Sequence, residues 1–232
     1  MNLISRDSKV LIAGDSWGDG EKHSIRNDPV DDIHLGLEVY LKEYGCNVTN
    51  ISIGGGSNRD TFNKLKSNLN QTYDVILVFQ TDPYRDLRPY QLHVEQFKKE
   101  KEDFLLLYDE LLDSAYERFN SLNVPIYILG GCSNVNLSLI KKYCNLYPII
   151  PNIIDMLGDN SIPPKIWKSD WIKISDWNKS SNKKIFSESL LEFLYFDNMK
   201  LSKKWFYPDP WHPNREAHKK IFEYLMNFKL TD

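Results

Sequence analysis

Apolar runs that fit buried strands alternate with longer stretches of helical periodicity along the first 130 residues. The strand-like runs are short and rich in β-branched residues, as expected for strands covered on both faces. They lie at residues 9–13, 47–53, 74–79 and 124–129. The helical stretches, with apolar residues three and four apart, lie at residues 33–44 and 97–122. Strands separated by helices of this length predict a parallel sheet with right-handed crossovers, which is an α/β fold.

The pattern becomes less regular beyond residue 133. The segment 133–204 contains four prolines and no sustained period, and we interpret it as an irregular insertion that shapes specificity. Its polar run 178–184 is predicted to be an exposed loop. Residues 214–228 return to helical spacing and predict the last helix. No linker or repeat interrupts the chain, so we predict a single domain over residues 1–232.

Composition excludes several classes of function. The net charge is −3 and the lysines are spread along the sequence, whereas nucleic-acid binding relies on a clustered basic surface. The three cysteines lack metal or disulfide spacing, and no apolar stretch reaches membrane-spanning length. The first residues lack the apolar core of a signal peptide, so we expect none. We therefore expect a cytoplasmic protein with reduced thiols, no nucleic-acid partner and no membrane span.

Polar and glycine-rich motifs follow each of the first three predicted strands. Ser16 follows the first strand, residues 54–58 follow the second, and residues 80–85 follow the third. Near the end of the chain, Asp209 and His212 precede the last predicted helix. Because ligands bind at the carboxyl ends of strands in open parallel sheets, we expect these segments to converge on one edge.

A serine, a histidine and an aspartate together suggest nucleophilic catalysis. A hydroxyl is a weak nucleophile until a neighbouring base takes its proton and a third group orients that base. Asp209-Pro210-Trp211-His212 supplies both partners within one short segment. Each motif alone has a plainer interpretation, since Gly-Asp-Ser is common in turns and helix caps. Their occurrence in this order favours a catalytic site.

These motifs resemble the blocks of the SGNH or GDSL-type serine hydrolases, which occur in this order on a flavodoxin-like sheet. Gly14-Asp15-Ser16 is similar to the first block and Asp209-x-x-His212 to the last. The resemblance implies a three-layer α/β/α sandwich in which Ser16 is the nucleophile, His212 the general base and Asp209 its orienting carboxylate. It further implies that Gly55 lies in the oxyanion hole. The middle of the chain is not explained by the resemblance.

The third block departs from the family pattern. The family has Gly-x-Asn-Asp, whose Asn donates a hydrogen bond to the oxyanion, whereas this chain has Phe79-Gln80-Thr81-Asp82. Thr81 takes the Asn position in this alignment. Its hydroxyl is one candidate donor, and the side-chain amides of Asn58 and Gln80 are the others. Losing one oxyanion donor typically costs about 10²–10³ in turnover.

Other motifs are interpreted as structural. Gly14 to Gly18 also satisfies Gly-x-Ser-x-Gly, but an α/β-hydrolase elbow needs several strands before its serine, and only one fits here. No pair of histidines has metal spacing with a supporting carboxylate, so we predict no metal and no cofactor. The remaining histidines are interpreted as surface or helix residues: His23, His34, His93 and His218.

Three residues beside the motifs are candidates for substrate contact. Trp17 and Trp211 flank the proposed nucleophile and base, either as an aromatic wall for a sugar ring or acyl chain or as ordinary packing. Arg85 follows the third block, where it either holds a substrate carboxylate or pairs with Asp82 or Asp86. For Arg85 we favour the structural role.

The sequence favours a serine esterase that cleaves a small ester through an acyl-enzyme. An O-acetylated carbohydrate or a short acyl chain is the expected substrate class by family resemblance. Two alternatives stay open. One is a catalytically weak or inactive module that binds carbohydrate, for example within a phage particle or another exported assembly, and the other is an O-acyltransferase. Neither the acyl group, the alcohol nor the oligomeric state follows from the sequence.

Overall fold

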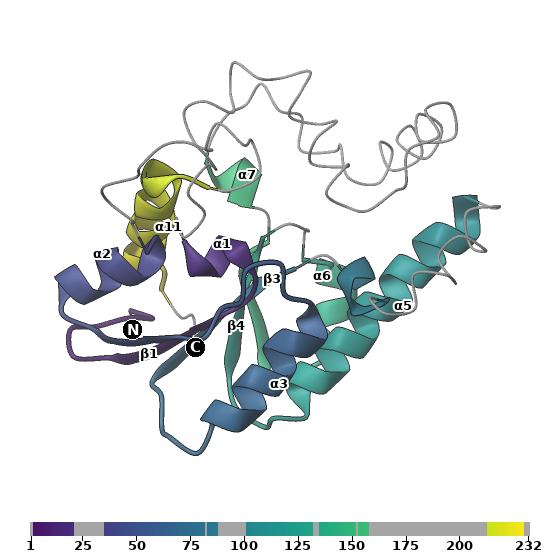
Figure 1. Ribbon diagram of the computed structural model, residues 1–232, viewed down its shortest axis with the longest axis horizontal. Coiled ribbons are helices and arrows are strands. Elements are labelled where there is room, and N and C mark those ends of the chain that lie inside the picture. Colours follow the sequence, from purple (N-terminus) through teal and green to yellow (C-terminus); the bar gives the residue numbers. More distant parts are fainter. Residues whose placement is uncertain are drawn as a thin grey trace.

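Five parallel strands form the centre of the molecule, in the order β2-β1-β3-β4-β5 (Figure 1). A computed structural model describes residues 2–20, 35–81, 83–87, 101–131, 135–151, 153–157 and 213–229. The strands are β1 (Lys9–Ala13), β2 (Asn47–Asn50), β3 (Val75–Gln80), β4 (Ile126–Gly130) and β5 (Leu146–Ile150). Every pairing in this sheet is parallel.

The strand order confirms the predicted flavodoxin-like α/β sheet. The chain runs outward from β1 to β2 and then crosses back to β3 on the other side of β1. In doubly wound sheets of this order, the switch point at the carboxyl ends of the first and third strands is where ligands bind. The residues that follow β1 and β3 are therefore the ones to examine for function.

Helices cover both faces of the sheet, which gives the predicted three layers (Figure 1). On one face lie α1 (Ser16–Asp19), α2 (Leu37–Tyr44) and α11 (Arg215–Asn227). On the other lie α3 (Asn58–Asn68), α5 (Lys101–Asn120) and α6 (Leu137–Ile140). Two further short elements are η1 (Pro83–Leu87), a 3-10 turn, and α7 (Ile153–Met156).

The alternation of side chains along β1 and β3 divides the core into two layers. Val10 and Ile12 of β1 pack with α2 and α11, in what we call the first core layer. Leu11 and Ala13 pack with α3 and α5, in the second core layer. All four side chains are fully buried, as the continuous apolar run predicted.

Helix α3 was not predicted from the sequence. Its buried residues include Asn58 and Thr61, so the apolar periodicity that identifies a helix is weak. Its start is nevertheless encoded in Ser57 and Asp60, which form a reciprocal capping box. The Ser57-x-x-Asp60 capping box was therefore the sequence feature that could have predicted the start of this helix.

Strand β5 was also missed, because Pro148 lies within it. Proline cannot donate to a ladder and is tolerated on edge strands. In the described sheet β5 lies at the edge, beyond β4, and the register between them shifts at Ile128 and Leu129. The segment 133–204 thus contributes a strand to the sheet, whereas its polar run 178–184 lies outside the described residues.

The remaining predicted elements are confirmed with small changes at their ends. The strand predicted at 47–53 ends at Asn50, and that at 124–129 begins at Ile126. The predicted last helix, 214–228, is α11. Of the helices in the described part of the chain, none combines the length and apolar character that crossing a bilayer demands.

Replacing Leu77 by Ala should test the central position of β3. Leu77 is fully buried between β1 and β4, so the cavity should lower the free energy of unfolding by about 2–5 kcal/mol. Urea denaturation measures this change. Leu137→Ala is the matched control, because its side chain is 46% exposed and the change should stay within about 0.5 kcal/mol. Equal effects of both substitutions would contradict the described core.

Candidate active site

Ser16 begins a short helix directly after the interior strand β1. Asp15 is the N-cap of α1, and its Oδ1 accepts a hydrogen bond from the backbone N–H of Trp17 (3.0 Å). The N–H groups of Gly18 and Asp19 bond to the carbonyl of Asp15. These bonds fix Ser16 at the switch point, where its residue is 5% exposed.

The preceding glycine allows β1 and β3 to approach closely at this point. Gly14 has a φ of +143°, which residues other than glycine rarely adopt. A Cβ atom on it would lie 2.7 Å from both the Cβ and the carbonyl oxygen of Phe79 in β3. The glycine of the first block is therefore required by the packing beneath Ser16.

The glycine-rich loop after β2 is attached to the same turn. The N–H of Ile53 donates to the carbonyl of Gly14 (3.0 Å), and Gly56 turns back to donate to Ile53 (2.8 Å). Gly55 has a φ of +71° at the tip of this turn. This glycine-rich segment, residues 54–58, is the second block, and it begins within direct hydrogen-bond reach of the first.

Asn58 joins the second block to the third. Its Nδ2 donates to the carbonyl of Thr81 (3.1 Å), and its Oδ1 accepts from the N–H of Thr81 (3.3 Å). Asn58 and Thr81 are almost completely buried. The amide that we predicted as an oxyanion donor thus holds two backbone groups of the neighbouring loop.

Asp15 and Thr81 join the first block to the third. The hydroxyl of Thr81 donates to Asp15 Oδ2 (2.8 Å), and Arg85 Nη1 donates to the same oxygen (2.9 Å). Asp15 is 0% exposed and Arg85 8% exposed, so this is a buried ion pair. Together with the Asn58 bonds, it brings the residues of all three blocks together, as the sequence predicted for the sheet edge.

The prediction that Arg85 pairs with Asp86 is wrong, whereas a pair with Asp82 stays a prediction. We expected Asp82 or Asp86, but Arg85 pairs with Asp15, and Asp82 lies outside the described residues. Successive side chains of a 3-10 turn diverge by about 120°, so neighbours in η1 point to different partners. The oxygens of Asp86 accept from Arg118 Nη2 (2.6 Å) and from the N–H of Arg59 (2.8 Å). The ion pair with Asp15 supports the favoured structural role of Arg85.

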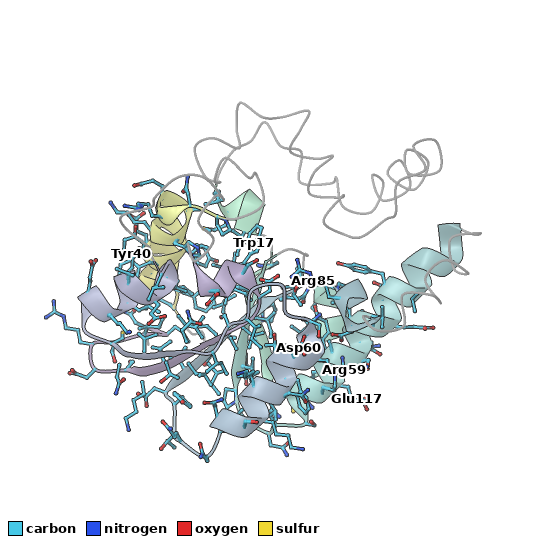
Figure 2. All side chains as sticks on the ribbon, in the orientation of Figure 1. Trp17, Tyr40, Arg59, Asp60, Arg85 and Glu117 are labelled. Carbon is cyan, nitrogen blue, oxygen red and sulfur yellow. The ribbon has the colours of Figure 1, made fainter. Side chains whose placement is uncertain are left out.

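Trp17 is part of the first core layer, not of an exposed wall. Its side chain is 1% exposed and packs in the same cluster as Leu37 and Leu41 of α2. Figure 2 shows Trp17 in α1 and Arg85 in η1 toward the same end of the sheet. Of the two interpretations given for Trp17, the described contacts are those of ordinary packing.

The last block lies outside the described residues. Asp209, Trp211 and His212 all belong to this block, so their roles stay predictions. The chain is described again from Pro213, and Asn214 caps α11 by accepting from the N–H of Ala217 (3.0 Å). Ala217 packs in the first core layer with Trp17. The helix that follows His212 and the helix that begins with Ser16 therefore cover the same face of the sheet.

His218 is a helix residue, as expected, but it is completely buried. A Cβ on Gly36, whose φ is +58°, would lie 2.9 Å from its imidazole ring. The sequence held a signal for this burial. His218 lies on the apolar side of α11, beside Ala217 and one turn before Ile221.

Gln80, at the end of β3, is hydrogen-bonded to α5. Its Oε1 accepts a hydrogen bond from the hydroxyl of Tyr116 (2.6 Å), which in turn accepts from the N–H of Asn136 (3.1 Å). Burial raises the pKa of Tyr116 well above its ordinary value, so the phenol stays protonated and a donor at neutral pH. Gln80 therefore links β3 to α5.

The described residues contain no group of three or more His, Cys, Asp or Glu side chains that could hold a metal ion. Within this part of the chain, the chemistry available at the switch point is that of a hydroxyl, backbone N–H groups, an amide and a buried ion pair.

Comparisons with known proteins yield similar structures only. No protein-family profile and no curated protein matches the chain. It is similar to Axe2, an acetylxylan esterase from Geobacillus stearothermophilus, at 15% sequence identity and a TM-score of 0.45, over 99% of this chain and 98% of that one. It is also similar to TesA, at 13% identity and a TM-score of 0.41, over 94% of this chain and 95% of that one.

Replacing Gly14 by Ala should distort the turn of Ser16. The new Cβ meets backbone and Cβ atoms of β3 that cannot move aside, so we expect a loss of at least about 2 kcal/mol in the free energy of unfolding. Gly45→Ala is the matched control. Gly45 also has a positive φ, of +109°, but its nearest neighbours are side-chain atoms of Arg6 at 3.8 Å or more.

For Gly45→Ala, the free energy of unfolding should fall by only about 1–2 kcal/mol, the cost of placing an L residue at a positive φ. Chemical denaturation measures both variants. A Gly14→Ala protein as stable as Gly45→Ala would contradict the close approach of Phe79.

Proposed function

We propose that the protein is a serine esterase with Ser16 as its nucleophile. The observation that carries the proposal is the convergence of three loops at the switch point, held by the bonds of Asp15, Thr81 and Arg85. Ser16 follows Asp15 directly, so its hydroxyl lies where such sheets bind ligands.

His212 is proposed as the general base and Asp209 as the carboxylate that orients it. The block geometry is not described, but the start of α11 supports the assignment. Tyr40 of α2 donates to the carbonyl of Arg215 (3.0 Å), which ties the chain three residues beyond His212 to the helix beside Trp17. The described chain that follows His212 thus leads into a helix on the face of the sheet that carries α1, which supports the assignment.

The oxyanion hole is proposed to use the backbone N–H groups of Ser16 and Gly55. The N–H of Ser16 makes no hydrogen bond to another described residue, since the capping bonds begin at Trp17. Thr81 and Asn58, which we also predicted as donors, are hydrogen-bonded within the protein. A contribution from either one requires that it exchange this bond for the oxyanion.

The reaction proposed is acyl transfer to water. Ser16 Oγ attacks the ester carbonyl while His212 takes its proton, the tetrahedral intermediate expels the alcohol, and His212 returns the proton to it. Water then adds to the acyl-enzyme by the same route and releases the acid and Ser16. The substrate class is a small ester, either an O-acetylated carbohydrate or a short acyl chain, and no cofactor is required.

Labelling with a fluorophosphonate probe tests the nucleophile. The wild-type protein should be labelled, and Ser16→Ala and His212→Ala should abolish both labelling and the turnover of p-nitrophenyl acetate and butyrate. Asp209→Asn should slow turnover by up to about 10⁴-fold, because the base loses its orientation. Mass spectrometry of the labelled peptide should place the adduct on Ser16.

Ser67→Ala and His93→Ala are the controls for this experiment. Ser67 is an exposed residue of α3, and His93 belongs to none of the blocks, so both variants should behave as wild type. A folded wild-type protein that takes no label would refute the esterase. Glycan arrays would then test the alternative, a binding module whose altered third block lacks the family's Asn.

A further inference from the structure

Arg85 contacts all three loops of the candidate site through one nitrogen. Its Nη1 lies 2.9 Å from Asp15 Oδ2, 3.1 Å from Thr81 Oγ1 and 3.3 Å from the carbonyl oxygen of Gly56. These three acceptors belong to the first, third and second blocks respectively. A single guanidinium therefore sits where the blocks meet.

Asp15 transmits this contact to the nucleophile. Its Oδ2 accepts from Arg85 and Thr81, while its Oδ1 accepts from the N–H of Trp17 and so caps the helix that Ser16 begins. Rotation of the carboxylate would break bonds on both sides at once. The orientation of the Ser16 turn is therefore coupled to the position of Arg85.

Charge fixes the direction of the Thr81 proton. A guanidinium only donates hydrogen bonds and a carboxylate only accepts them. Thr81 Oγ1 accepts from Arg85 Nη1 and must direct its own proton to Asp15. The residue that replaces the family's Asn is thus a member of the ion-pair network, which accounts for the departure of the third block.

We propose that Arg85 is a positioning residue for Ser16, and that Thr81 acts through this network and not as a donor to the oxyanion. The proposal rests on the proposed esterase function and deepens it. Neither side chain needs to touch the substrate. Displacing a reacting group by about 1 Å can lower the rate about 10²-fold, so loss of the network should slow attack without weakening substrate binding.

Arg85→Met tests the proposal by the rate of fluorophosphonate labelling. Methionine keeps an unbranched chain of similar reach and removes the charge and the donors. We expect labelling to slow by about 10–100-fold. With p-nitrophenyl acetate, the loss should fall on kcat, while KM stays within about twofold because Arg85 does not contact the ester.

Arg118→Met is the matched control. Arg118 Nη2 pairs with Asp86 at 2.6 Å, and the Asp86 side chain is 1% exposed. Because Asp86 is the neighbour of Arg85 in the sequence, the substitution breaks a comparable ion pair close to Arg85. The side-chain bonds of Arg118 to described residues go to Ser114 of α5 and to Asp86 of η1, and neither reaches the turn of Ser16. This variant should lose thermal stability but label within about twofold of wild type, measured below both melting temperatures.

Thr81→Val distinguishes the two roles of the hydroxyl. Within the network, Thr81→Val should slow labelling as a single change but add little to Arg85→Met. An independent oxyanion donor would make the two losses multiply. Thr81→Ser should restore the wild-type rate, since it keeps the hydroxyl.

The outcomes separate the two proposals. Labelling of wild type with an undiminished rate in folded Arg85→Met overturns the positioning role and leaves the esterase intact. Absence of labelling in wild type overturns the esterase and the positioning role with it. If Arg85→Met does not fold, Asp15→Asn carries the same test, because it keeps the size of the side chain and the Oδ1 acceptor; a wild-type labelling rate in that variant overturns the role.

Discussion

The buried carboxylate of Asp15 is the group on which the candidate site depends. A charge without access to water requires an opposite charge and hydrogen-bond donors close by. Asp15 finds them in Trp17, Thr81 and Arg85, which belong to three different elements. Satisfying one side chain therefore fixes the relative positions of a helix start, a strand end and a 3-10 turn. The candidate nucleophile is the residue next to that carboxylate.

The sheet makes this arrangement possible. Because β1 and β3 are neighbours and parallel, the residues that follow them leave the sheet at the same edge. The glycine at position 14 lets these two strand ends touch, and the Asn58 amide then connects the loop after β2 to the loop after β3. Polar groups in this region bond chiefly to backbone and side chains of adjacent loops. Polar side chains therefore join the loops at this edge, whereas apolar side chains cover both faces of the sheet.

The sequence was most informative where local pattern and tertiary environment agree. Continuous apolar runs gave β1, β3 and β4, and the order of motifs gave the edge at which Ser16, Asn58 and Thr81 meet. Helix α3 and strand β5 were missed because their local signals oppose their environment: polar residues are buried in α3, and Pro148 lies in β5. The Asp15–Arg85 pair was not predictable either, since it joins residues 70 positions apart through the fold. The roles of His212 and Asp209 stay at the level of the motif.

Pro148 has a consequence for how the sheet ends. Backbone groups point to alternate sides along a strand, and the carbonyl of Asn145 accepts from the N–H of Ile126 in β4 (2.8 Å). Three residues further on, the nitrogen of Pro148 faces away from β4, where it has no hydrogen to offer. An apolar strand that would otherwise template the addition of a foreign strand is thus interrupted at its centre. Within the described sheet, the irregularity that hid β5 from sequence inspection thus also removes a hydrogen-bond donor from the edge strand.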